Sequence, residues 1–142
     1  MKIEGAEPRP ASDGGPRTGE RPRRILLVDD EEVVRQVATR MLERLGFHVL
    51  AAQSGEEALA SYAAGPGEID LVLIDVSMPR ISGAECFRRL QEIDPAVRAV
   101  LSSGYGQDRA ARSLLGLGLA GFIQKPYQLA ELSNVVSGAL RG

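Results

Sequence analysis

Three carboxylates and one lysine stand at the ends of apolar runs in the sequence: Asp29 and Asp30, Asp75, and Lys125. Carboxylates brought close together repel one another and raise one another's pKa, and a divalent cation removes that conflict. Oxygen ligands with no histidine or cysteine nearby favour a hard ion, most plausibly Mg²⁺. An ammonium group beside them suits a phosphoryl group, for which an aspartate can be the nucleophile. These residue types therefore predict magnesium-assisted phosphoryl transfer, provided that the fold brings them together.

Two serines, Ser102 and Ser103, follow a fourth apolar run and would add a hydroxyl to this set. Each motif also has an ordinary structural explanation when it stands alone. An Asp-Asp pair before a helix is more often a cap than a metal site, a Lys-Pro pair after a strand is mostly a turn, and Ser-Ser-Gly is a common loop. The functional interpretation depends on four strand ends converging.

The elements that would position these residues follow from the hydrophobic pattern. Short apolar runs predict strands, and segments with apolar residues at three-to-four spacing predict helices. The predicted strands cover residues 25–28, 47–52, 69–75, 97–101 and 120–124, and the predicted helices cover about 31–45, 55–64, 83–93, 107–115 and 129–140. Strands that alternate with helices predict an α/β fold, with a parallel sheet covered on both faces and right-handed crossovers. The carboxyl ends of such strands share one edge, where ligands gather.

Particular side chains define the expected faces and ends of the helices. Asp30 is expected to cap the first helix, and a capping box at 54–57 opens the second. The first and third helices are expected to bury one apolar face each. These faces consist of Val33, Val34, Val37, Met41, Leu42 and Leu45 in the first helix, and of Phe87, Leu90 and Ile93 in the third.

Length and composition suit one domain with a tail. The chain has 142 residues, a net charge of −2 and a single cysteine, Cys86. This charge gives no bulk attraction to nucleic acid or to an anionic membrane, and the cysteine pattern is consistent with a reducing, cytoplasmic setting. No apolar run approaches the length of a membrane span, and the N-terminus lacks the apolar core of a signal peptide. Residues 1–22, rich in Pro, Gly, Arg and Glu, are expected to form a disordered tail.

Four segments together resemble the receiver domain of two-component response regulators. They are ILLVDD at 25–30, LIDVSMP at 73–79 with a glycine at 83, LSSG at 101–104 and FIQKP at 122–126. The resemblance covers the chain from about residue 24 to its end. It implies a flavodoxin-like (βα)5 doubly wound fold, with a five-stranded parallel sheet in the order 2-1-3-4-5. It also divides the chain into the tail, 1–22, and a receiver domain, 23–142.

The resemblance implies roles for the acidic residues. Asp75 would be the phosphoacceptor. Asp30 and Asp75 would bind Mg²⁺ directly, and Asp29 would act mostly through water or hydrogen bonds. Ser77 would add its backbone carbonyl to the metal site. In this family the position of Ser77, and that of Tyr105, also tunes dephosphorylation.

The resemblance also implies a switch. Ser103 would be the hydroxyl that turns toward the phosphoryl group, because Gly104 matches the small residue that follows this hydroxyl in the family; Ser102 is the rival. Lys125 would be the cation, joined to Pro126 by a cis peptide bond. Phe122 occupies the position of the switch aromatic. Since it lacks a hydroxyl, any change there would be steric.

The implied function is a phosphorylation-dependent switch in a phosphorelay. A sensor histidine kinase or phosphotransfer protein would phosphorylate Asp75, and the face formed by the fourth helix, the fifth strand and the last helix, with Arg109 and Arg112, would regulate a partner. Such a bacterial protein is no conventional enzyme, although it catalyses its own phosphoryl transfer and dephosphorylation. Two alternatives are a phosphorylation-independent adaptor and an aspartate-nucleophile phosphatase, which would need a carboxylate where Ser77 stands. A free-standing receiver and the receiver of a hybrid kinase both fit the sequence.

Overall fold

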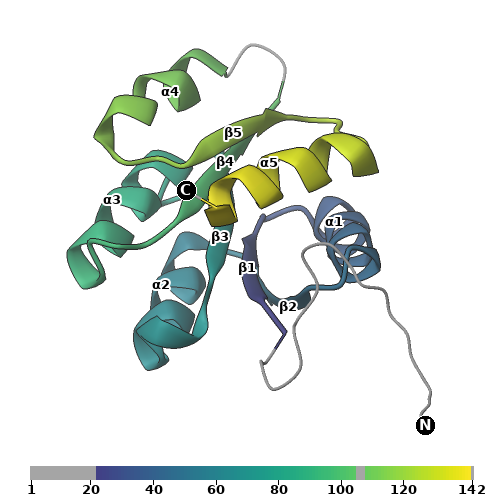
Figure 1. Cartoon of the computed structure of the whole chain (residues 1–142). Helices are drawn as coiled ribbons and strands as arrows, with labels where there is room; N and C mark the ends of the chain where they lie inside the picture. The colour runs from purple at the N-terminus through teal and green to yellow at the C-terminus, as the bar shows by residue number, and fades with distance from the viewer. Residues whose placement is uncertain (1–21, 105–107, 142) are drawn as a thin grey trace, which may run out of the picture.

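The computed structural model describes residues 22–104 and 108–141, and it forms one parallel sheet between two layers of helices (Figure 1). The strands are β1 (Arg24–Val28), β2 (His48–Ala52), β3 (Leu71–Asp75), β4 (Ala99–Ser103) and β5 (Gly121–Gln124). The helices are α1 (Glu32–Arg44), α2 (Gly55–Ala64), α3 (Gly83–Ile93), α4 (Asp108–Ser113) and α5 (Leu129–Arg141), with short 3₁₀ turns η1 (Pro66–Glu68) and η2 (Leu115–Leu117). The strand order is β2-β1-β3-β4-β5, and every pairing is parallel. The predicted fold class and strand order are therefore confirmed.

Each face of the sheet has its own hydrophobic core. Helices α1 and α5 cover one face, and α2, α3 and α4 cover the other (Figure 1). The strand residues alternate between the two cores: on β3, Leu71 and Leu73 belong to the core under α1 and α5, whereas Val72 and Ile74 belong to the opposite one. All five residues of β3 and of β4 are buried. This burial explains why the apolar residues of the two strands are consecutive, at 71–74 and 99–101, rather than alternating with polar ones.

The starts of two helices follow the sequence closely. Ser54 accepts a hydrogen bond from the Glu57 amide at the start of α2, and Ser82 does the same for Glu85 in α3. The prediction that Asp30 caps α1 is wrong. The N-cap is Glu31, whose side chain makes no capping bond. Instead, the Asp29 carboxylate accepts a hydrogen bond from the Glu31 amide, at 2.9 Å.

Three apolar side chains expected in the core lie at the surface. Val33 and Val37 of α1 are 72% and 53% exposed, and Ile93 at the end of α3 is 39% exposed. Ala38 and Leu42 carry the buried face of α1 instead. Val33 and Val37 line a groove between α1 and the Lys125–Tyr127 segment.

Other differences concern the boundaries of elements. Strand β4 continues to Ser103, two residues beyond the end that the apolar run predicts. Helix α4 has six residues and is followed by η2. Residues 1–21, almost the whole predicted tail, and Tyr105 lie outside the described residues. Within the described part of the chain, no helix has the length and hydrophobicity that a bilayer crossing requires.

Candidate functional site

The residues singled out in the sequence meet at the carboxyl edge of the sheet. Asp75 ends β3 and is paired with Ser102 of β4, while Ser103 is paired with Gln124 of β5. Lys125 directly follows that pair, and its amide donates a hydrogen bond to the Ser103 carbonyl at 2.7 Å. On the other side, the Asp29 amide bonds to the carbonyl of the last residue of β2, which continues the ladder beyond β1. The backbone ladder thus fixes where each functional side chain starts.

The alternation of side chains along each strand sorts these residues between the two faces. Asp29, Asp75 and Lys125 continue the series of residues that face the core under α1 and α5. Ser103 belongs to the series that faces the opposite core. It lies two residues after Leu101, which is part of that core and is paired with Phe122. The carboxylates and the lysine therefore gather beneath the start of α1, while Ser103 and Phe122 share the face covered by α3 and α4.

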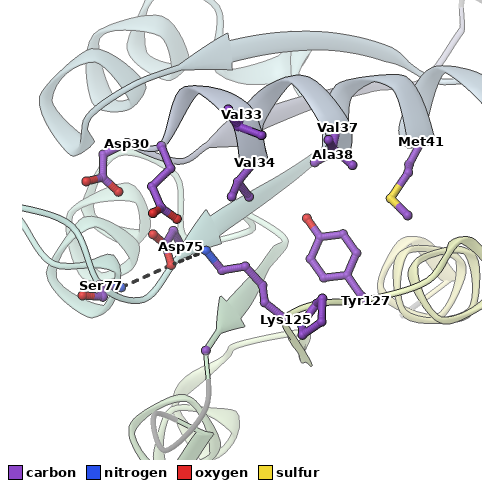
Figure 2. Close-up of a pocket in the computed structure, with 13 residues that line it drawn as sticks. Asp30, Val33, Val34, Val37, Ala38, Met41, Asp75, Ser77, Lys125 and Tyr127 are labelled. Carbon is purple, nitrogen blue, oxygen red and sulfur yellow. Dashed lines mark hydrogen bonds and ion pairs between the residues drawn. The ribbon is translucent and has the colours of Figure 1, made fainter.

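The Lys125 ammonium joins two of the carboxylates. Its Nζ atom lies 3.2 Å from Oδ2 of Asp29 and 3.3 Å from Oδ1 of Asp75. Figure 2 shows the lysine reaching from the far side of the groove to Asp75. Asp29 and Asp75 are both 3% exposed, so the pairing takes place with little solvent. One positive charge thus faces two buried negative charges, and one negative charge is left unbalanced.

This crowding changes the acidity of the cluster. Burial raises the pKa of Asp75 to about 6; the negative charge of Asp29 adds to the rise, and the Lys125 ammonium opposes it. Burial also acts to lower the pKa of Lys125, but the charges of Asp29 and Asp75 outweigh burial and raise it. Lys125 therefore stays charged near neutral pH. A further cation beside Asp75 and Asp29 would relieve their remaining repulsion.

The third carboxylate differs from the other two in its exposure. Asp30 is exposed, and its carboxylate makes no hydrogen bond within the part of the chain that the structure describes. Carboxylate oxygens of Asp29, Asp30 and Asp75 lie within 4.8 Å of one another. In addition, the Asp75 carboxylate accepts a 3.4 Å hydrogen bond from the Ser77 amide. A cluster of oxygen donors with an open side toward solvent fits a hard divalent cation that keeps several waters.

The buried hydroxyl of Ser103 lacks a partner. Ser103 is fully buried, and its Oγ atom is the buried side-chain polar atom that makes no hydrogen bond within the described residues. Such an atom carries a desolvation cost that a new acceptor would remove. On the same face, Phe122 is half-buried, and the guanidinium of Arg112 lies 4.6 Å from the centre of its ring. Arg109, which lies on α4 together with Arg112, is exposed.

An apolar groove opens beside Asp75, between α1 and the Lys125–Tyr127 segment (Figure 2). Its volume is about 740 Å³. Val33, Val37 and Met41 contribute aliphatic walls, and the Tyr127 ring lies opposite them. Burial raises the pKa of Tyr127 to about 12, helped by the charges of Asp29 and Asp75, so its hydroxyl keeps its proton. Sequence reasoning missed this groove because it placed both valines in the core. The Lys125–Pro126 peptide bond is cis, as the resemblance implied.

Comparison with known proteins agrees with the family resemblance of the sequence motifs. Residues 25–137 match the family described as the response regulator receiver domain. The chain is 38% identical over 116 residues to the sensor kinase CckA of Brucella abortus, a match that covers 82% of this chain but 12% of that protein. It is 30% identical over 118 residues to the chemotaxis protein CheY of Bacillus subtilis, covering 82% of this chain and 97% of CheY. The chain thus spans a small part of some relatives and nearly the whole of others.

A solved structure agrees with the sequence matches. A chain of the CheX–CheY–BeF₃–Mg²⁺ complex from Borrelia burgdorferi superimposes with a TM-score of 0.80 at 29% identity. The match covers 87% of this chain and 92% of that one. The chain therefore belongs to the response regulator receiver domain family of two-component systems.

Proposed function

We propose that this chain is a phosphorylation switch that takes a phosphoryl group onto Asp75. The observation that carries the proposal is the cluster in which Lys125 lies within 3.3 Å of both Asp29 and Asp75 at the carboxyl edge of the sheet. A buried nucleophile beside a fixed cation suits phosphoryl transfer, which proteins catalyse mainly by positioning and by neutralising charge. The domain would comprise residues 23–142 and would act in the cytoplasm.

The transfer step forms one bond and breaks another. A carboxylate oxygen of Asp75 attacks the phosphorus of a phosphohistidine on the donor protein. The P–N bond breaks, and the imidazole leaves with the electron pair of that bond. The product is an acyl phosphate on Asp75. Lys125 would hold one oxygen of the arriving group and would keep that position through its contact with Asp29.

Magnesium would be bound by the acidic cluster. Asp30 and Asp75 would bind the ion directly, Asp29 would do so through water, and the backbone carbonyl of Ser77 would complete the protein ligands. The open carboxylate of Asp30 and the 4.8 Å spread of the three acids support this arrangement. The ion would supply positive charge to the oxygens of the transferring group.

The conformational change on phosphorylation would be transmitted from Ser103 to Phe122. Ser103 has a buried hydroxyl with an unused hydrogen-bonding capacity, and a phosphoryl oxygen on Asp75 would accept its hydrogen bond. Movement of Ser103 would open space on the face that Phe122 shares. Phe122 would then move by steric packing, and the surface of α4, β5 and α5 would change for a downstream partner.

The apolar groove would receive the phosphodonor. It lies next to Asp75, and its exposed valines give a docking helix apolar contacts at the point where the phosphoryl group must arrive. The donor would be a sensor histidine kinase or a phosphotransfer protein, and an amphipathic helix of that protein could lay its apolar face against these side chains. A phosphatase role is less well supported, because Ser77 stands where that mechanism needs a second carboxylate.

Acetyl phosphate with Mg²⁺ tests the proposal. We expect the intact mass of the wild-type protein to rise by one phosphoryl group and the adduct to be removed by hydroxylamine, which cleaves acyl phosphates but leaves phosphoserine. Asp75→Asn should give no adduct. The proposal is contradicted if the wild-type protein remains unmodified, which would favour a phosphorylation-independent adaptor. It is equally contradicted if the adduct persists in Asp75→Asn or resists hydroxylamine.

A further inference from the structure

The Asp29–Asp30 segment is held by a side chain from the next helix. The guanidinium of Arg35, at the end of the first turn of α1, donates a hydrogen bond from one Nη atom to the backbone carbonyl of Asp29 at 2.7 Å. This bond spans six residues and runs from the helix back to the end of β1. In the opposite direction, Asp29 Oδ1 accepts the hydrogen bond of the Glu31 amide at 2.9 Å. The segment that carries Asp30 is therefore enclosed by two hydrogen bonds to Asp29.

Every polar atom of Asp29 makes a hydrogen bond. Its amide bonds to Ala52, its carbonyl accepts from Arg35, and its two carboxylate oxygens accept from Glu31 and Lys125. Asp30 lies one residue further on, and its exposed carboxylate has no such support in the described part of the chain. The position of the Asp30 carboxylate consequently depends on how firmly the backbone on either side is held.

The start of α1 gives no alternative support. Its N-cap residue, Glu31, makes no side-chain capping bond. The carbonyl of Asp29 would lose its side-chain donor if Arg35 were replaced, in a place that is only partly open to water. A hydrogen bond from a charged donor contributes more to stability than one from a neutral donor. We therefore expect the loss of this bond to make the Asp29–Asp30 segment more mobile.

We propose that Arg35 is a positioning residue for the metal site, acting through the Asp29 carbonyl on the carboxylate of Asp30. The proposal rests on the magnesium site of the proposed function. Arg35 would contact neither the ion nor the phosphoryl group. Because Arg35 is cationic, simple electrostatics predicts the opposite effect, namely that removing its charge would tighten cation binding. Weaker cation binding after replacement of Arg35 would therefore indicate a positioning role, and tighter binding would indicate a purely electrostatic one.

The test measures metal binding without any phosphorylation. Mn²⁺ is a hard divalent ion with a strong paramagnetic signal. Electron paramagnetic resonance measures the concentration of free Mn²⁺ as the ion is titrated into the full-length protein. Mg²⁺ is then added to compete for the site. We expect Arg35→Gln to weaken Mn²⁺ binding about tenfold, as is usual when a group that orients a metal ligand is removed. Arg40→Gln is the matched control, since Arg40 is an exposed arginine of the same helix and its replacement removes the same charge.

The outcomes separate this proposal from the proposed function. Unchanged or tighter Mn²⁺ binding by Arg35→Gln, or equal weakening by Arg40→Gln, would overturn the role of Arg35. If the wild-type protein itself bound no Mn²⁺, the magnesium site would fail together with the role given to Arg35. Circular dichroism of each metal-free variant monitors folding. If Arg35→Gln does not fold, Arg35→Met, which keeps the aliphatic part of the side chain, takes its place under the same criteria.

Discussion

Gly83 packs directly against the backbone of Asp75, so closely that a Cβ atom on residue 83 would overlap the Asp75 carbonyl oxygen. The same Cβ atom would lie 2.8 Å from the Cα atom of Val76. The Gly83 amide also donates a hydrogen bond to the Val76 carbonyl at 2.9 Å. The first residue of α3 is thus in contact with the segment that carries the proposed phosphoacceptor.

Replacement of this glycine should therefore affect stability and the site together. We expect Gly83→Ala to lower the free energy of unfolding by about 1–3 kcal/mol, because backbone rather than a flexible side chain must move to admit the methyl group. Urea unfolding measures this change. Gly116→Ala is the control, since a Cβ atom there would meet nothing within 4 Å. A Gly83→Ala protein as stable as the control variant would show that the contact is relaxed in solution.

The acidity of Asp75 gives a prediction about pH. Its pKa is raised from 3.8 to about 6, so the folded protein binds more protons than the unfolded chain between those values. Stability without metal should therefore fall as the pH rises from about 4 to about 6 and then level off, because the charged carboxylate is the disfavoured form in the fold. Asp75→Asn should lack this slope and should be more stable than wild type at pH 7 by about 2–3 kcal/mol.

Urea unfolding in EDTA at a series of pH values provides the measurement. The comparison of interest is the difference between wild type and Asp75→Asn at each pH, since titrating groups away from this cluster contribute equally to both. A constant difference across this range would mean that burial and Asp29 do not raise the pKa of Asp75 as the structure indicates.

The sequence was sufficient to place the cluster at the sheet edge, for a physical reason. Each of the four motifs marks the end of its own strand, and parallel strands bring their ends to the same edge whatever the details of packing. Asp29, Asp75, Ser103 and Lys125 could therefore be located by counting along each apolar run. The observed pairing of Asp75 with Ser102, and of Ser103 with Gln124, follows from the same strand ends.

The groove and the support from Arg35 could not be found in this way. Helical spacing identifies an apolar face of α1 but not how far the sheet extends beneath it, so Val33 and Val37 were assigned to the core although they are exposed. Asp30 has the residue type of an N-cap, but the N-cap is Glu31, and the Asp29 carboxylate accepts a hydrogen bond from the Glu31 amide. Arg35 reaches its partner through a long side chain, whose direction depends on the tertiary structure.

The ion pairs of Lys125 predict a stability effect that metal should reduce. Lys125→Met leaves Asp29 and Asp75 facing each other without a cation, and we expect a loss of about 2 kcal/mol in EDTA, below the cost for a fully buried pair because the lysine keeps some contact with solvent. Excess Mg²⁺ should recover part of this loss, since the ion would neutralise the same carboxylates. Urea unfolding with EDTA and with Mg²⁺ tests both statements. Equal losses in the two buffers would argue against a metal site at these acids.

The exposed valines of α1 predict a defect limited to protein donors. Val37 is 53% exposed, so Val37→Ser should change stability by less than about 0.5 kcal/mol. It should nevertheless slow phosphotransfer from a histidine-phosphorylated donor that acts on the wild-type chain, by about fivefold or more, because interface anchors commonly contribute more than about 1 kcal/mol. Phosphorylation by acetyl phosphate, which needs no docking surface, should be unaffected.

The control for this experiment is Ile93→Ser. Ile93 is 39% exposed, but it lies at the end of α3 and is not among the residues that line the groove. Radiolabelled phosphotransfer and acetyl phosphate kinetics are followed for both variants. Equal slowing by Val37→Ser and Ile93→Ser, or slowing of the acetyl phosphate reaction by Val37→Ser, would show that the groove is not the donor's docking site.

The contact between Arg112 and Phe122 predicts a coupling that phosphorylation should change. The guanidinium lies 4.6 Å from the ring centre, a distance at which a partly exposed cation–π pair contributes about 0.5–1 kcal/mol. A double-mutant cycle with Arg112→Gln and Phe122→Leu, followed by urea unfolding, should give a coupling energy of this size in EDTA. If Ser103 draws toward a phosphoryl group and Phe122 moves into the space it leaves, the coupling should fall when Mg²⁺ and beryllium fluoride, the ions of the Borrelia complex, are added. A coupling energy that stays the same in both buffers would mean that Phe122 is a fixed part of the core and that the signal leaves the site by another route.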